Sequence, residues 1–125
     1  MTPQPKVLIV DDEPDYLRIA AKIAAGAGCA VVTAATAAEG VALGARELPD
    51  LVLMDVGLPD GSGFDAARAL RREKRLSSVP VIFFTVRSEL DMVREGLSLA
   101  KVGYVLKPFD PDDLERRIRE AVLPS

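Results

Sequence analysis

The sequence predicts a doubly wound α/β fold, in which a five-stranded parallel sheet carries helices on both faces. Five short apolar runs alternate with five stretches that have apolar residues at helical spacing. Three of the runs are continuously apolar, which is typical of parallel strands buried on both faces. A chain of 125 residues is long enough for one domain of this kind.

The apolar runs define the expected strands. In chain order they cover residues 7–10, 31–35, 51–54, 79–84 and 102–106. The first, third and fourth are the continuous runs. Because crossovers between parallel strands are right-handed, few topologies remain, and we expect the flavodoxin-like order 2-1-3-4-5.

The stretches between and after the runs predict helices. Apolar residues recur at helical spacing over 16–27, 38–48, 64–70, 90–97 and 114–122. Capping residues precede four of them: Asp12 with Pro14, Thr36 with Glu39, Ser88 with Asp91, and Asp110 with Pro111. Gly26 and Gly28 are expected to end the first helix.

Composition excludes several kinds of chemistry. The chain has no histidine, which excludes an imidazole base and a His-ligated zinc site. Its only cysteine, Cys29, cannot form an internal disulfide, which fits a reducing cytoplasm. No apolar run approaches the length of a membrane span. A net charge of −3 argues against direct binding of nucleic acid.

Polar side chains gather at the predicted carboxyl ends of the strands. Asp11 and Asp12 follow the first strand, Asp55 the third, Thr85 the fourth and Lys107 the fifth. The second strand, which should lie outside the switch point, ends in alanines. Since doubly wound folds bind ligands at this edge of the sheet, the pattern predicts a functional site there.

This set of residues suits phosphoryl transfer. Two unit charges about 4 Å apart repel by roughly 4 kcal/mol at an effective dielectric of 20, so three carboxylates in one crevice require a cation. Mg²⁺ binds such carboxylates and leaves positions for phosphate oxygens. Lys107 is expected to pair with Asp55, which is the best candidate for a nucleophile that forms an acyl phosphate.

The chain resembles a response-regulator receiver domain of two-component signalling. The residues that carry the resemblance are VLIVDDEP (7–14), LVLMDVGLPDGSGFD (51–65), VPVIFFT (79–85) and YVLKPF (104–109). The resemblance implies one receiver domain over residues 1–125, with a core of about 6–122 and no output domain.

The resemblance also implies roles for the acidic residues. Asp55 would be the phosphoacceptor. Asp11 and Asp12 would be the acidic pair that holds Mg²⁺, with Asp55 and the backbone carbonyl of Gly57 completing the protein ligands.

Three further residues acquire roles in the same way. Thr85 would be the switch hydroxyl that turns toward the phosphoryl group. Lys107 would pair with a phosphoryl oxygen and precede a proline bond that is often cis. Tyr104 would be the aromatic switch that reshapes the face formed by the fourth helix, the fifth strand and the fifth helix.

The function implied is a phosphorylation-activated signalling switch of bacterial type. Because the chain lacks histidine, a sensor histidine kinase or phosphotransfer protein must supply the phosphohistidine. The domain would catalyse its own phosphorylation and slow dephosphorylation, and a downstream effector protein or domain would read its state.

Two other classes of function are compatible with the sequence. A receiver-like adaptor would bind partners without phosphorylation. A nucleotide-binding module would use Gly61-Ser-Gly63-Phe-Asp-Ala66, which matches G-x-G-x-x-A but follows the third strand rather than the first. We interpret that segment as a turn.

Overall fold

The structure is a computed structural model that describes residues 4–86 and 99–123. Its main sheet contains β1 (Lys6–Val10), β2 (Ala30–Ala34), β3 (Leu51–Asp55), β6 (Val81–Thr85) and β7 (Val102–Leu106). All neighbouring strands are parallel, and their order is β2-β1-β3-β6-β7. The predicted order 2-1-3-4-5 is therefore confirmed.

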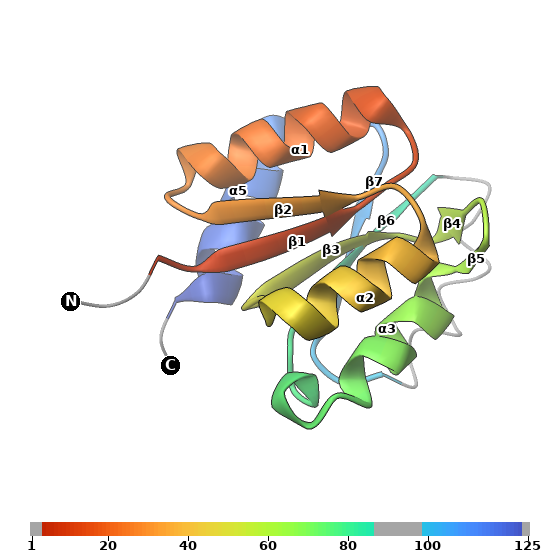
Figure 1. Ribbon diagram of the computed structural model, residues 1–125. Helices are drawn as coiled ribbons and strands as arrows, with labels where there is room; N and C mark the ends of the chain where they lie inside the picture. The colour runs from red at the N-terminus through yellow and green to blue at the C-terminus, as the bar shows by residue number, and fades with distance from the viewer. Residues whose placement is uncertain (1–3, 87–98, 124–125) are drawn as a thin grey trace.

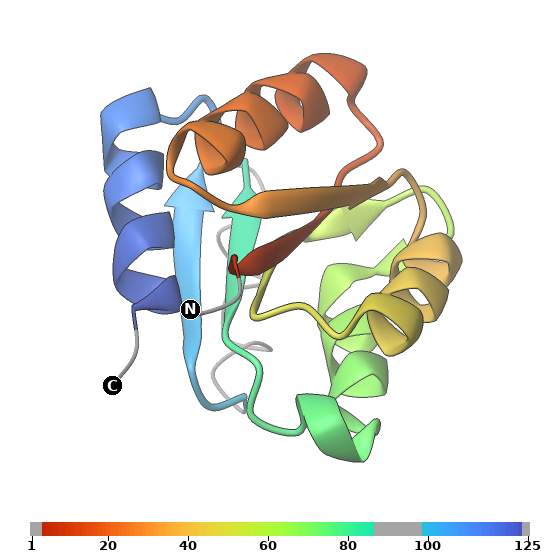
Figure 2. The same cartoon turned by 60° about the vertical axis from the view of Figure 1, so that its left-hand side comes forward.

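The described helices cover both faces of this sheet (Figures 1 and 2). They are α1 (Pro14–Gly26), α2 (Ala37–Glu47), α3 (Gly63–Arg71) and α5 (Pro111–Val122), with a 3₁₀ turn at Lys74–Leu76. Helices α1 and α5 pack on one face and α2 and α3 on the other. The predicted helix over 90–97, with its cap Ser88–Asp91, lies outside the described residues.

Alternation along the central strands produces two cores. In β6, Val81 and Phe83 join the cluster under α2 and α3, whereas Ile82 and Phe84 join the cluster under α1 and α5. Every residue of β3 and β6 is buried, as expected for parallel strands covered on both faces.

The helix starts agree with prediction at two places and differ at one. The Thr36 side chain accepts a hydrogen bond from the Glu39 amide. The Asp110 side chain accepts one from the Asp112 amide, and Pro111 occupies the first position of α5. Asp12 does not cap α1, so that prediction was wrong. The N-cap of α1 is Glu13, whose side chain makes no capping hydrogen bond.

The strand limits also differ slightly from the apolar runs. Val79 and Pro80 precede β6 and are not part of it. The apolar residue Val79 is nevertheless buried, which explains why hydrophobicity alone extended the strand. A small antiparallel hairpin, β4 (Gly57–Leu58) and β5 (Gly61–Ser62), occupies the predicted turn after Asp55.

Candidate functional site

The strand register aligns the predicted site residues at one edge of the sheet. Val10 is opposite Met54, so that Asp11 and Asp55 follow at the same level. Asp55 is opposite Phe84, the residue before Thr85. Thr85 is opposite Leu106, the residue before Lys107. Four segments far apart in the sequence thus end together.

Three carboxylates converge at this edge. Asp11, Asp12 and Asp55 each offer an oxygen that lies within 4.8 Å of the others. Asp11 is fully buried and Asp55 is 5% exposed, whereas Asp12 is exposed. The group therefore extends from the protein interior to the solvent.

Lys107 provides the positive charge of the site. Its Nζ lies 2.8 Å from Asp11 Oδ2 and 2.8 Å from Glu13 Oε1, and 3.5 Å from Asp55 Oδ2. The ammonium also lies 4.5 Å from the ring centre of Tyr16, in a cation–π contact. The predicted pair with Asp55 is present, but the shortest contacts run to the residues that follow β1.

The environment of Lys107 has opposing effects on its pKa. Burial alone would lower the pKa, because it disfavours the charged form. Pairing with Asp11 and Glu13, together with the attraction of Asp55, outweighs burial and raises the pKa of Lys107 above its ordinary value. The side chain therefore remains a cation at neutral pH.

The carboxylates fit a hard divalent cation. Asp11 Oδ2 is buried, and its partner among the described residues is the Lys107 ammonium, with which it forms an ion pair at 2.8 Å. Three carboxylates contact the one ammonium, and Asp12 lies beside two of them, which leaves an excess of negative charge when all are ionised. Oxygen ligands of this kind are those that Mg²⁺ prefers.

Thr85 and Tyr104 lie on β6 and β7 beside this site. Thr85 is 1% exposed, and its hydroxyl donates to the carbonyl of Val86 at 3.2 Å. Tyr104 is half-buried, and its ring stacks on Phe83 with centres 5.7 Å apart. Burial raises the pKa of the Tyr104 phenol. Tyr104 therefore packs against the core formed with α2 and α3.

The backbone after Asp55 is held by a close approach to α3. Gly63 donates to the carbonyl of Val56 at 2.8 Å. A Cβ atom at Gly63 would lie 2.1 Å from the carbonyl oxygen of Asp55, a distance that backbone cannot accommodate. Only glycine permits this packing, which closes the loop carrying Gly57.

Sequence reasoning missed two residues of the site. Glu13 follows the predicted acidic pair but was given no role, although it contacts Lys107. Tyr16 was assigned only to the apolar side of α1, yet its ring lies over the same ammonium. Their positions, one and four residues after Asp12, could have indicated that both lie near the site, since the start of α1 must face the strand ends.

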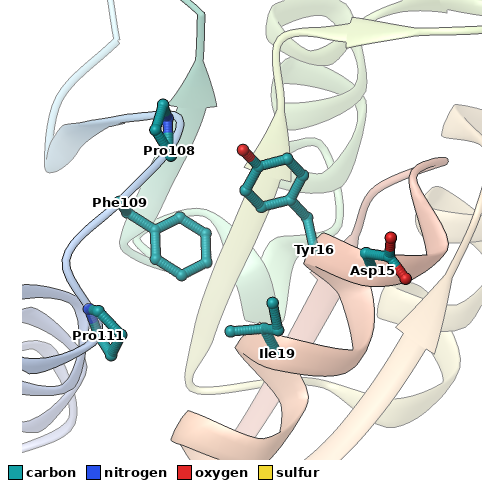
Figure 3. A pocket seen from close by; sticks show the side chains of 6 residues that line it. All are labelled: Asp15, Tyr16, Ile19, Pro108, Phe109 and Pro111. Carbon is teal, nitrogen blue, oxygen red and sulfur yellow. The ribbon is translucent and has the colours of Figure 1, made fainter.

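An apolar groove of about 370 Å³ adjoins the site (Figure 3). Tyr16 and Ile19 of α1 face Phe109 and the prolines on either side of it. The rings of Tyr16 and Phe109 lie 5.6 Å apart. The Lys107–Pro108 bond at the end of the groove is cis, as the resemblance implied. Ile19 is 43% exposed and presents an apolar surface at the edge of the groove.

None of the described helices is long and apolar enough to cross a bilayer.

Comparison with solved structures supports the fold. The chain resembles the chemotaxis response regulator CheY4 of Vibrio cholerae, with a TM-score of 0.87 and 27% identity over 95% of this chain and 99% of that one. It also resembles a receiver domain protein from Methanospirillum hungatei, with a TM-score of 0.84 and 30% identity over 96% and 94% of the two chains.

Curated relatives are similar over nearly the whole chain. "Probable transcriptional regulator ycf27" of Porphyridium aerugineum is 36% identical over 94% of this chain and 48% of its own length. The transcriptional regulatory protein KdpE of Mycobacterium tuberculosis is 37% identical over 93% of this chain and 50% of its own. The chain thus spans about half the length of these relatives.

The sequence profile of the response regulator receiver domain matches residues 7–119. Of the described elements, that range contains all strands except Lys6 of β1, and α5 except its last residues; it also includes the acidic group and Lys107. The chain therefore belongs to the family of response regulator receiver domains.

Proposed function

We propose that this receiver domain accepts a phosphoryl group on Asp55 from a phosphohistidine, in a reaction that depends on Mg²⁺. The observation that carries the proposal is the convergence of Asp11, Asp12 and Asp55 within 4.8 Å, with the buried Lys107 ammonium among them. Holding like charges together opposes folding, so a function that uses them best explains the arrangement.

The proposed step exchanges one bond to phosphorus for another. A carboxylate oxygen of Asp55 attacks the phosphorus, and the bond between phosphorus and the donor's imidazole nitrogen breaks. The electron pair of that bond stays on the nitrogen, and Asp55 becomes an acyl phosphate. Asp11, Asp12, Asp55 and the Gly57 carbonyl would hold Mg²⁺, which would neutralise charge on the phosphoryl oxygens.

Two other side chains act on the same phosphoryl group. Lys107, already 3.5 Å from Asp55 Oδ2, offers its ammonium to a phosphoryl oxygen. Thr85 exchanges its bond to the Val86 carbonyl for one to another oxygen. The chain brings no histidine as a base, so we expect hydrolysis of the acyl phosphate to be slow.

We infer that these contacts shift a two-state equilibrium. Moving a population from mostly inactive to mostly active takes on the order of 5 kcal/mol, which several charge-assisted hydrogen bonds can supply. When Thr85 turns toward the phosphate, Tyr104 would turn inward and change the face that includes β7 and α5. A downstream effector protein or domain would read that face, in the cytoplasm.

A protein phosphodonor has to contact the surface beside Asp55. A sensor histidine kinase or phosphotransfer protein must bring its imidazole to Asp55. Tyr16 connects the site to the apolar groove, because it lines the groove and its ring lies 4.5 Å from the Lys107 ammonium. We therefore infer that the protein donor places apolar side chains near its histidine against Ile19 and Phe109.

Intact-mass measurement tests the central step. The protein is treated with a small-molecule phosphodonor and Mg²⁺, and one added phosphoryl group is expected. Asp55→Asn and addition of a chelator should each prevent the gain. Asp65→Asn is the matched control, since Asp65 is an exposed aspartate of the next helix that pairs with Arg68. No added mass in any condition would favour the adaptor that binds partners without phosphorylation.

A further inference from the structure

We propose that Asp60 is a positioning residue, which fixes the loop carrying Gly57 by binding the N-terminus of α2. The inference rests on the proposed function, because Gly57 matters only if its carbonyl holds Mg²⁺. Asp60 lies in the two-residue turn between β4 and β5, five residues after Asp55.

Asp60 completes the N-terminus of α2 from a distance in sequence. Its Oδ1 accepts from the Ala37 amide at 2.7 Å, and its Oδ2 accepts from the Ala38 amide at 3.0 Å. Thr36, the N-cap, accepts from Glu39 at 3.1 Å. The first three amides of the helix are therefore all satisfied, two of them by a residue of another element.

The backbone bonds and the helix end stabilise Asp60 as an anion. The two amide hydrogen bonds hold the pKa of the Asp60 carboxyl below its usual range. The positive end of the helix dipole acts in the same direction. The contact is therefore a charge-assisted pair of bonds between the hairpin and α2.

Helix α2, to which Asp60 binds, is packed closely against its neighbours. A Cβ atom at Gly40 would lie 2.8 Å from a methyl group of Val10, and one at Gly44 would lie 2.3 Å from Leu70. The backbone of α2 thus lies directly against β1 and α3. A loop bound to the start of this helix has little freedom to drift.

The loop from Val56 to Gly63 contains the β4–β5 pair and is attached to the rest of the domain at three places. The Gly63 amide donates to the Val56 carbonyl where the two ends of the loop meet, which we call the neck. Leu58 is buried in the core under α2 and α3. Asp60 holds the tip through α2. Gly57 lies between the neck and the tip and is itself exposed, so neither side-chain packing nor burial fixes its carbonyl. Without Asp60, the tip loses its attachment and the Gly57 carbonyl samples more orientations.

A purely structural cap would stabilise α2 without affecting metal binding. A positioning residue lowers Mg²⁺ affinity when it is removed, and by reciprocity Mg²⁺ must strengthen its contacts. In the unmodified protein, we therefore expect Mg²⁺ to slow hydrogen exchange at the Ala37 and Ala38 amides.

The test measures Mg²⁺ dissociation constants by NMR titration for the unmodified protein and for Asp60→Ala, Asp60→Asn and Asp65→Ala. Asp60→Ala should raise Kd by about fivefold, the lower end of coupling between sites. Asp60→Asn retains one acceptor oxygen and should lie between. Asp65→Ala, which removes an exposed surface pair, should leave Kd unchanged.

A second variant removes the donor instead of the acceptor. Ala37→Pro deletes the amide that binds Asp60 Oδ1 and places proline at the first helical position, where it is favoured. Thr36 already has the extended conformation that a following proline requires, with φ −133° and ψ 160°. The variant therefore keeps α2 intact and remains informative if Asp60→Ala does not fold.

The outcomes separate the two proposals. A higher Kd in Asp60→Ala and in Ala37→Pro, with no further rise in the double variant, supports the inference. Additive effects, or lost amide protection with an unchanged Kd, would overturn it and leave the proposed function standing. If the unmodified protein binds no Mg²⁺, the proposed function itself fails.

Discussion

Lys107 is the residue on which the charges of the site converge. Its ammonium contacts carboxylates from the end of β1 and from β3, and it is almost completely buried. Removing one member of a buried charged group leaves the others uncompensated. Lys107 therefore carries a structural role in addition to the proposed contact with phosphate.

We expect Lys107→Gln to lower the free energy of unfolding by about 3 kcal/mol at neutral pH, because the buried carboxylates lose their counter-charge. Excess Mg²⁺ should restore part of this loss in the variant. Urea unfolding with and without Mg²⁺ measures both effects. Lys22→Gln on the exposed side of α1 is the control, and an equal loss in both variants would contradict the role of Lys107.

The same residue predicts a loss of stability at alkaline pH. Because the pKa of Lys107 is raised by folding, its contribution is complete below its unfolded pKa of about 10.4 and disappears as pH rises through the folded value. The raised pKa of Tyr104 acts in the same direction, since the unfolded phenol loses its proton first. Urea unfolding between neutral pH and pH about 11 should show a decline that is smaller in Lys107→Gln and in Tyr104→Phe. An unchanged profile in Lys107→Gln would contradict this account.

At the scale of elements, the start of α3 fixes the backbone at the end of β3. Gly63 lies so close to Asp55 that even one methyl group collides with its carbonyl oxygen. The collision is with backbone, so no rotation of a side chain can relieve it. The end of β3 and the start of α3 must therefore separate in any variant with a side chain at this position.

We expect Gly63→Ala to destabilise the protein by about 2 kcal/mol and to slow phosphorylation of Asp55, because the strand end is displaced. Gly26→Ala is the matched control. It lies at the end of α1 with no atom within 4 Å of the added Cβ, so it should be neutral or slightly stabilising. Thermal unfolding and intact mass measure the two effects, and wild-type behaviour of Gly63→Ala would show that the backbone adapts.

The groove between α1 and the segment before α5 allows docking of a protein phosphodonor to be distinguished from the chemical step at Asp55. We expect Ile19→Glu to reduce phosphoryl transfer from a protein phosphodonor, since a carboxylate replaces an apolar contact surface. Transfer from a small-molecule donor should be unchanged, because Ile19 is not among the residues of the site. Lys22→Glu, an exposed change on α1 that does not line the groove, is the control. Equal loss with both donors would contradict docking at the groove.

For the molecule as a whole, the site lies where two cores meet. The clusters under α1 and α5 and under α2 and α3 are separated by the sheet, and the carboxyl ends of its strands border both. A charge placed at this edge therefore acts on helices of both layers. This arrangement connects events at Asp55 to surfaces on either face.

We expect Mg²⁺ to stabilise the whole domain, because the ion binds carboxylates that are brought together only by folding. At a hundredfold excess over Kd the gain is about 2.7 kcal/mol. Thermal unfolding with Mg²⁺, and again after chelation, measures it. Asp12→Asn should remove most of the gain, since Asp12 is one of the three converging carboxylates. A gain that persists in Asp12→Asn would place the ion elsewhere.

The sequence by itself determined the five strands, their order and the convergence of the acidic residues. Each follows from local pattern, since continuous apolar runs indicate buried parallel strands and the carboxyl ends of such strands meet at one edge. Thr36 and Asp110 were also predictable, because a capping residue acts on amides only two or three positions away.

Only the tertiary structure decided the contacts between residues far apart in the chain. Glu13 meets Lys107 across 94 positions, and Asp60 binds α2 across 22 and 23. The tertiary structure also decided that α1 starts after Glu13 rather than after Asp12. The close approach of Gly63 to Asp55 was likewise set by tertiary packing. Local periodicity specifies which face of an element is buried, whereas these contacts depend on how elements are placed against one another, which packing of the whole chain sets.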